Sequence, residues 1–233
     1  MQDLQFTDSD KLAKQLAQDL AGRMQRTIEK EGAVAIALSG GSTPVKFFQA
    51  LSQQKIDWKK VTVTLVDERW VDKTDSASNA RLVKENLLQG EARHAWFIPL
   101  KNSAATAVDG FMECENRLQV EIKALHYAVL GMGIDGHCAS WFPNSKALSS
   151  LLADDQQARC FPVTDAPQFA QRMSLTWTFL ASCKHLFLHF EGEEKNATFA
   201  KVGSITEIQN VEAMPVRKLF AQNQVDLTVY RTR

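Results

Sequence analysis

The sequence predicts an α/β fold in which a mainly parallel sheet carries helices on both faces, giving three layers. Short apolar runs alternate along the chain with longer segments of helical periodicity. Several of these runs show no polar alternation, which is typical of parallel strands buried on both faces. Three of the runs also end directly in glycines or charged residues, where ligands of parallel-sheet proteins bind.

The balanced charge of the chain gives no indication of a strongly charged binding partner. The 233 residues include 27 Lys and Arg against 27 Asp and Glu, so no net field attracts nucleic acid or a membrane. No apolar run approaches the roughly 18 residues of a membrane span, and the polar residues 1–10 lack a signal-peptide pattern. The 4 cysteines lack CxxC or Cys–His spacing, which predicts reduced thiols and no structural metal. We expect a cytoplasmic monomer or small homo-oligomer, with no nucleic-acid or membrane partner.

The first expected elements are a long helix and a buried strand. Residues 8–31 repeat an apolar residue every four positions, and Gly32 marks the end of this helix. The apolar stripe consists of Leu12, Leu16, Leu20, Met24 and Ile28. Residues 33–38 then form an apolar run of strand length.

A glycine-rich turn, residues 39–44 (Ser-Gly-Gly-Ser-Thr-Pro), follows this strand. Pro44 suits the first turn of a helix and Thr43 suits its N-cap. Free backbone N–H groups at a helix N-terminus, beside hydroxyl groups, bind phosphate. The alternative is an ordinary strand-to-helix turn, because the segment matches neither the GxGxxG fingerprint nor a P-loop.

The next predicted strand, residues 61–66, ends in three charged residues, Asp67, Glu68 and Arg69. Arg69 offers a planar fork for phosphate or carboxylate, and Asp67 is suited to orient a histidine or a sugar hydroxyl. A solvated turn or an internal ion pair would account for the same charges.

The middle of the chain continues the alternation. Residues 71–79 are loop-like, and Ser78 suits the cap of a helix reaching about residue 88. A short strand is expected at 97–100, and a long helix over 104–125 with Glu115 at the edge of its apolar stripe.

The most informative stretch follows the predicted strand at residues 127–130. The glycines at 131, 133 and 136 let the backbone approach a ligand closely, and Asp135 stands two residues before His137. A histidine at the rim of a sheet titrates near neutrality and is suited to act as a base. A tight turn with a surface histidine would show the same pattern.

Two further cations stand out in the last third of the chain. Arg172 comes just before an apolar run, and Lys195 lies on a helix opening at 191–195, where a surface position is the simplest expectation. The other expected elements are a helix within 145–152, strands at 159–164, 186–190 and 225–230, and a helical piece at 216–220. No repeat or linker divides the chain, so residues 1–233 are expected to form one domain.

The three polar strand ends should meet at one rim of the sheet. In open parallel sheets, ligands bind outside the carboxyl ends of the strands. The turns at 39–44, 67–69 and 131–137 together supply anion-binding amides, a cation and a titratable base. This combination predicts a small phosphorylated substrate that undergoes proton-transfer chemistry.

The same residues resemble the 6-phosphogluconolactonase family, which belongs to a larger group with glucosamine-6-phosphate isomerase/deaminase. The resemblance rests on residues 39–44, 66–69 (Val-Asp-Glu-Arg), 78–79 (Ser-Asn) and 131–140 (Gly-Met-Gly-Ile-Asp-Gly-His-Cys-Ala-Ser). It implies a Rossmann-like three-layer sandwich, hydrolysis of 6-phosphogluconolactone in the oxidative pentose phosphate pathway, and no metal or organic cofactor.

Two details favour a lactonase over a deaminase within this resemblance. Deaminases usually have another residue in place of Arg69, and after the histidine they carry a Glu that assists ring opening, whereas residues 138–143 contain no acidic residue. This chain departs from the lactonase pattern at Cys138 for Thr, Trp141 for Leu and Ser174 for Thr. Cys138 is not expected to be a nucleophile, and its replacement of Thr affects only a local hydrogen bond.

The expected roles follow from the resemblance and the local chemistry together. His137 is the expected general base, and Asp135 shapes its turn or, alternatively, orients its ring. The candidate substrate-binding residues are Gly40, Gly41, Ser42, Thr43, Asp67, Arg69, Gly133, Arg172 and, more weakly, Lys195. The rivals are a glucosamine-6-phosphate isomerase/deaminase and a non-catalytic sugar-phosphate sensor, which would need the anion site but no base.

Overall fold

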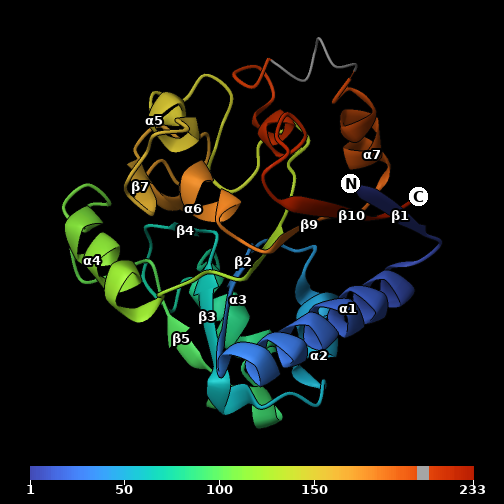
Figure 1. Cartoon of the computed structure of the whole chain (residues 1–233). Coiled ribbons are helices and arrows are strands. Elements are labelled where there is room, and N and C mark those ends of the chain that lie inside the picture. Colours follow the sequence, from blue (N-terminus) through green and yellow to red (C-terminus); the bar gives the residue numbers. More distant parts are fainter. Residues whose placement is uncertain (204–209) are drawn as a thin grey trace.

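A seven-stranded parallel sheet forms the centre of the molecule and confirms the predicted α/β class (Figure 1). The computed structural model describes residues 1–203 and 210–233. The strand order is β1-β10-β9-β6-β2-β3-β5, and each neighbouring pair is parallel. The strands are β1 (Gln2–Phe6), β2 (Val34–Leu38), β3 (Val61–Leu65), β5 (Trp96–Ile98), β6 (Tyr127–Leu130), β9 (His185–Phe190) and β10 (Asp226–Thr232).

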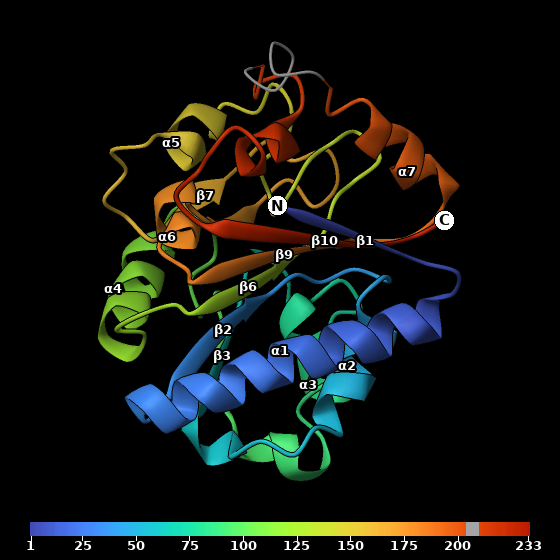
Figure 2. The same cartoon turned by 45° about the vertical axis from the view of Figure 1, so that its right-hand side comes forward.

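Helices cover both faces of this sheet, as Figure 2 shows. The long helix α1 lies with α2 on one face, and α5, α6 and α7 lie on the opposite side. The helices are α1 (Ser9–Glu31), α2 (Val45–Ser52), α3 (Asn79–Asn86), α4 (Phe111–Glu121), α5 (Leu148–Leu152), α6 (Trp177–Ala181) and α7 (Glu193–Ala200). Short 3₁₀ helices span Trp58–Lys60, Gly90–His94 and Pro215–Leu219. None of the helices in the described ranges is long and apolar enough to cross a bilayer.

Helix α1 forms as its periodicity predicts. The Asp8 carboxylate caps its first turn by accepting from the Lys11 backbone N–H at 2.8 Å. Gly32 ends the helix in the left-handed region (φ 85°), and its N–H bonds the Ile28 carbonyl. The predicted apolar stripe is buried against the sheet. The helix therefore owes its stability to packing of that stripe as well as to its caps.

A second, three-stranded antiparallel sheet was not predicted. It consists of β4 (Asp67–Arg69), β8 (Arg172–Leu175) and β7 (Cys160–Val163), in the order β4-β8-β7. The charged segment that we expected to end a strand as a turn is itself a short strand. Its register sets Arg69 directly opposite Arg172. The small sheet therefore brings two arginines together from positions more than 100 residues apart in the chain.

Two other predictions of secondary structure are wrong at the chain's first residues and in the middle. Residues 2–6, which we left without structure, form edge strand β1 beside β10. The long helix expected over 104–125 is only α4, and Val108 is 55% exposed rather than on a buried stripe. The loop before α4 ends at Gly110, where the Trp70 ring occupies the place of a side chain, 2.3 Å from a Cβ position. This loop packs around Trp70 instead of coiling.

Glu115 is buried inside the protein rather than at the edge of a helix stripe, so that expectation is also wrong. It is 4% exposed, and its carboxylate accepts the backbone N–H groups of Arg159 and Cys160 at 2.8 and 3.1 Å. These bonds replace the lost hydration of the carboxylate and join α4 to β7. All four cysteines are free and buried.

Candidate active site

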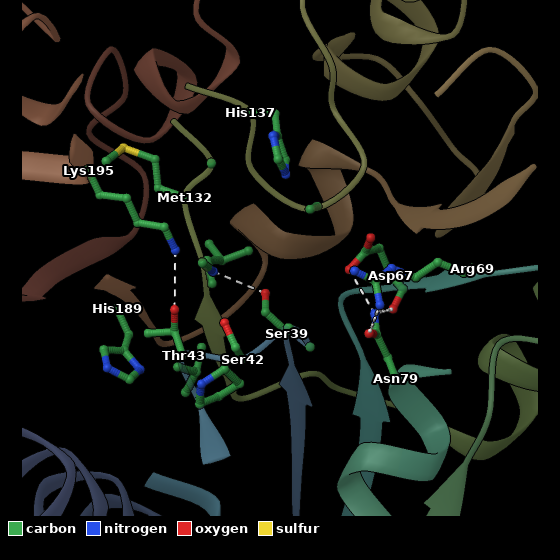
Figure 3. Close-up of a pocket in the computed structure, with 18 of the residues that line it drawn as sticks. Ser39, Ser42, Thr43, Asp67, Arg69, Asn79, Met132, His137, His189 and Lys195 are labelled. Carbon is green, nitrogen blue, oxygen red and sulfur yellow. Dashed lines mark hydrogen bonds between the residues drawn. The ribbon is translucent and has the colours of Figure 1, made fainter. Parts of the chain in front are cut away.

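The three predicted polar turns meet in one pocket at the carboxyl ends of β2, β3 and β6, which are neighbours in the sheet (Figure 3). Ten of the eleven candidate residues line it: Gly40, Gly41, Ser42, Thr43, Asp67, Arg69, Gly133, His137, Arg172 and Lys195. The eleventh, Asp135, lies behind the His137 ring. The geometric expectation that separate pieces of chain converge at one rim is therefore confirmed.

The turn between β2 and α2 forms one wall of the pocket. Among the described residues, no acceptor is bonded to the backbone N–H groups of residues 40–43. Gly41 adopts φ 92°, a conformation that favours glycine. The turn thus presents free N–H donors at the start of a helix, the arrangement that binds anions.

Thr43 does not cap α2, so that prediction is wrong. The N-cap position is Pro44, one residue later, and no side chain bonds the first helical N–H groups. The Thr43 hydroxyl instead accepts a hydrogen bond from Lys195 Nζ at 3.2 Å (Figure 3).

Lys195 reaches into the pocket from α7, so the expectation of a surface lysine is wrong. Burial lowers the pKa of its ammonium group, and the charge of Glu191 opposes that effect. A partly buried ammonium beside free N–H groups is a cationic partner for an anion. Residues 40–43 and Lys195 together form a set of donors suited to an anion, which we call the anion cradle.

A second cationic wall comes from the small sheet and the start of α3. Arg69 Nη1 donates to the Ala77 carbonyl at 2.8 Å and to Asn79 Oδ1 at 3.0 Å. Asn79 Nδ2 donates in turn to the Asp67 carbonyl at 2.8 Å. Gly40 makes room for this side chain, because a Cβ there would lie 1.9 Å from Asn79 Oδ1. Asn79 therefore joins the turn after β2 to Arg69.

Asp67 and Arg172 form a buried ion pair at the same wall. Arg172 Nη1 lies 3.5 Å from Asp67 Oδ2, and each side chain is 8% exposed. Ser140 Oγ donates to the same carboxylate oxygen at 2.6 Å. The Nε groups of Arg69 and Arg172 are buried and find no partner within the described ranges. The charges after β3 are thus gathered in the site and not solvated.

Glu68 supports this wall from behind. Its carboxylate accepts the backbone N–H groups of Asn79 and Ala80, each at 2.8 Å, at the first turn of α3. Burial raises the pKa of Glu68, and the two backbone hydrogen bonds act against that rise. Ser78, the predicted cap, does bond the Arg81 N–H at 3.2 Å, so α3 has two acceptors at its N-terminus.

His137 and Asp135 form an imidazole–carboxylate pair at the pocket rim. His137 Nδ1 lies 2.6 Å from Asp135 Oδ1, and the same oxygen accepts the His137 backbone N–H at 3.1 Å. Burial raises the pKa of Asp135, but its hydrogen bonds with His137 outweigh this and leave the pKa below its ordinary value. Asp135 therefore makes both contacts that the sequence suggested as alternatives, one that shapes the turn and one that orients the ring. Nε2 has no hydrogen-bond partner among residues 1–203 and 210–233, and Figure 3 shows the ring directed toward the pocket.

Several lining residues were not among the candidates: Ser39, Asn79, Met132, Ala139 and His189. Asn79 belongs to the Ser78-Asn79 segment that resembles the family, and this match could have marked it as a site residue. His189 lies in strand β9 between Leu188 and Phe190, and its Nε2 is hydrogen-bonded to Glu191 at 3.0 Å. Cys138 is fully buried, and burial raises the pKa of its thiol, which argues against a nucleophile. No group of three or more potential metal ligands occurs in the part of the chain that the structure describes.

Fold and pocket together define an α/β protein with an imidazole–carboxylate pair and a glycine-rich turn beside Lys195 at one rim of a parallel sheet. The chain belongs to the glucosamine-6-phosphate isomerase/6-phosphogluconolactonase family, whose model matches residues 7–229. A 6-phosphogluconolactonase of Mesorhizobium japonicum is 42% identical over 194 residues, covering 83% of this chain and 82% of that protein. One of Rhizobium meliloti is 38% identical over 227 residues, covering 97% and 96%.

A solved structure agrees with these relatives. The crystal structure of a 6-phosphogluconolactonase from Shewanella baltica is 37% identical and superposes with a TM-score of 0.93, covering 100% of this chain and 98% of that one. Within the family, this chain is therefore similar over its whole length to proteins named as lactonases.

Proposed function

We propose that this protein hydrolyses 6-phospho-D-glucono-1,5-lactone to 6-phosphogluconate, a step of the oxidative pentose phosphate pathway. A lactone is a cyclic ester, so the enzyme is a carboxylic ester hydrolase. The observation that carries the proposal is the presence, in one pocket, of an oriented imidazole and a separate anion cradle. The names of the relatives at 38–42% identity support the same activity.

The mechanism uses His137 as a general base. Asp135 accepts from Nδ1, which leaves Nε2 to take a proton from water as it attacks the lactone carbonyl. The guanidinium of Arg69 stabilises the tetrahedral oxyanion. The Gly133 N–H is bonded to the His137 carbonyl at 2.9 Å, so Gly133 contributes by letting the backbone pass close to the imidazole and not as an oxyanion donor. The protonated ring then returns its proton to the leaving ring oxygen.

The remote phosphate holds the substrate in register with this base. The N–H groups of residues 40–43 and the ammonium of Lys195 bind it, with Arg69 and Arg172 as further cations and Asp67 as acceptor for a sugar hydroxyl. Binding energy from this non-reacting group is used to orient the carbonyl, which is how remote contacts raise turnover.

The deciding experiment is a pH-controlled assay with freshly generated δ-lactone, corrected for its spontaneous opening. Turnover above that background supports the proposal. Release of ammonia from glucosamine 6-phosphate would instead indicate a deaminase. Tight binding of 6-phosphogluconate without any lactone turnover would indicate a sensor.

Replacing Lys195 by methionine should raise KM for the phosphorylated lactone and leave kcat close to its original value. A charged hydrogen bond contributes about 1.5–3 kcal/mol, so the rise in KM should be roughly ten- to a hundredfold. KM for unphosphorylated glucono-1,5-lactone should not change, because that molecule lacks the group that Lys195 binds. Steady-state kinetics with both lactones measure the difference.

The exposed Lys201, which follows the same helix, gives the control. Lys201→Met should alter neither KM. If KM rose equally for both lactones in Lys195→Met, Lys195 would not be a phosphate-binding residue.

Replacing Gly133 by alanine should lower kcat while the protein stays folded. A Cβ at residue 133 would lie 2.2 Å from His137 Nδ1 and Cε1 and 2.6 Å from Asp135 Oδ1. The ring is 31% exposed and is free to move away, so its orientation is lost at little cost to the fold. Misplacement of a catalytic group by about 1 Å can cost up to roughly a hundredfold. We expect a decrease in kcat of at least tenfold, by steady-state kinetics.

The matched control is Gly131→Ala in the same loop. Its nearest atom would be Ser39 Cβ at 3.9 Å, an ordinary contact. Equal activities of the two alanine variants would contradict the placement of the ring.

A further inference from the structure

At the tip of the loop that carries His137, the Met214 side chain packs against Gly136, whereas the two residues before it are largely exposed. The Ile134 side chain is 62% exposed, and that of Asp135 is 42% exposed. Within the loop, Gly133 N–H bonds the His137 carbonyl at 2.9 Å and Gly136 N–H bonds the Gly133 carbonyl at 3.1 Å. These bonds shape the loop but do not attach it to the rest of the protein. Its position therefore depends on contacts from neighbouring segments.

Within residues 1–203 and 210–233, two hydrogen bonds attach the tip from outside. The hydroxyl of Thr198 on α7 donates to the Ile134 carbonyl at 2.7 Å, and Thr198 is only 6% exposed. On the other side of the tip, Val216 N–H donates to the Gly136 carbonyl at 2.9 Å. The Ile134 carbonyl belongs to the residue directly before Asp135, which orients the His137 ring. The Thr198 bond is thus one residue removed from the imidazole–carboxylate pair.

The two attachments are themselves connected through Arg217. Its guanidinium donates to the carbonyls of Lys201 and Val202, at the C-terminal end of α7, at 2.8 and 3.0 Å. Arg217 follows Val216, and it is 9% exposed. The end of α7 and the segment that holds Gly136 are therefore fixed to each other. The tip is therefore hydrogen-bonded to two segments that are also hydrogen-bonded to each other.

Helix α7 also carries Lys195, three residues before Thr198 and on the same side of the helix. Within the anion cradle Lys195 contacts Thr43, and Thr198 contacts the loop of the base. One short helix therefore sets the spacing between the anion end of the pocket and the imidazole.

We propose that Thr198 is a positioning residue, which holds the Asp135–His137 pair in register with the anion cradle through its bond to the Ile134 carbonyl. This inference rests on the proposed function for its effect on turnover, but the loop attachment is measurable without it. Thr198 does not line the pocket, so its effect on His137 passes through the loop.

The test compares Thr198→Val, which removes the hydroxyl and keeps the shape, with Thr198→Ser, which restores the hydroxyl. Thr198→Val should lower kcat roughly tenfold, within the range expected when a catalytic group is misoriented. The decrease should be the same for phosphorylated and unphosphorylated lactone, with KM unchanged, which is the opposite of the Lys195→Met result. Thr198→Ser should retain kcat within about twofold, since the orienting hydrogen bond returns.

The control is Thr178→Val. The Thr178 hydroxyl on α6 also donates to a loop carbonyl, that of Gln156, at 2.8 Å, but Gln156 does not line the pocket. Equal losses in the Thr178 and Thr198 variants would show a general structural effect and overturn the proposal. So would an unchanged kcat in Thr198→Val, or a change confined to KM.

Amide hydrogen exchange separates this inference from the proposed function. Exchange in residues 133–137 should be faster in Thr198→Val than in the unaltered protein and in Thr198→Ser. If the unaltered protein hydrolyses no lactone, the proposed function fails, and exchange alone decides whether Thr198 holds the loop. Unchanged exchange would overturn the inference whatever the activity.

Discussion

Replacement of His137 by alanine is expected to lower kcat for the δ-lactone roughly 10²- to 10⁴-fold, the contribution of a general base. The ring is the titratable group that Asp135 orients at the pocket rim, with Nε2 free for a water molecule. KM should change little, because in the proposed mode of binding the phosphate is held by the anion cradle and not by His137. The fold should be retained, since the ring is 31% exposed and its loss leaves no large cavity.

The measurement is initial-rate kinetics after subtraction of spontaneous lactone opening, which would otherwise hide a large decrease. His94, which is exposed in the 3₁₀ helix Gly90–His94, provides the control, and His94→Ala should keep full activity. A His137→Ala enzyme with unaltered kcat would remove this residue from the role of base. In that case Asp135→Asn should not change kcat either, because Asp135 contributes to catalysis only by orienting the His137 ring.

The sequence predicted the main sheet well because burial there leaves a simple signature. Strands β2 and β6 are continuous apolar runs buried on both faces, and β9 is buried throughout although it contains His185 and His189. Glycine or charged residues follow each of the three strands directly or after one residue. The convergence of the three turns followed from a general property of parallel sheets. The edge strand β1 has a mixed pattern, with exposed residues between half-buried ones, so its polar sequence concealed it.

The electrostatic wall of the site could not be predicted in the same way. The pairing of Asp67 with Arg172 depends on an antiparallel register between two short segments that are distant in the chain. A three-residue strand such as β4 is too short to show a periodic sequence pattern. Lys195 was misjudged for a related reason, because a lysine on a short helix gives no indication of which face is buried. The residue types needed for the site could be recognised from their chemistry. Which of them are buried and hydrogen-bonded depends on contacts between distant segments, which the sequence does not show.

Replacing Arg172 by methionine should therefore destabilise the protein as well as weaken substrate binding. Removing one member of a buried ion pair leaves the other charge without compensation, which typically costs about 3–5 kcal/mol of unfolding free energy. Asp67 would keep the hydrogen bond from Ser140 Oγ at 2.6 Å. We therefore expect a loss near the lower end of that range, measured by urea unfolding at neutral pH.

The exposed ion pair Arg81–Glu85 on α3 serves as the control, because it shows how much stability is lost when an ion pair that is not buried is broken. Its atoms lie closer, at 2.7 Å, yet the two side chains are 39% and 55% exposed. Arg81→Met should cost at most about 1 kcal/mol, because water screens a surface pair and solvates the remaining carboxylate. Adding Asp67→Asn to Arg172→Met should recover part of the lost stability, since the amide carries no charge to desolvate. Two results would contradict this explanation: equal losses of stability in the Arg172 and Arg81 variants, or no recovery on adding Asp67→Asn. In either case the uncompensated Asp67 charge would not cause the loss, and the contact of Arg172 with the Phe142 ring would account for it instead.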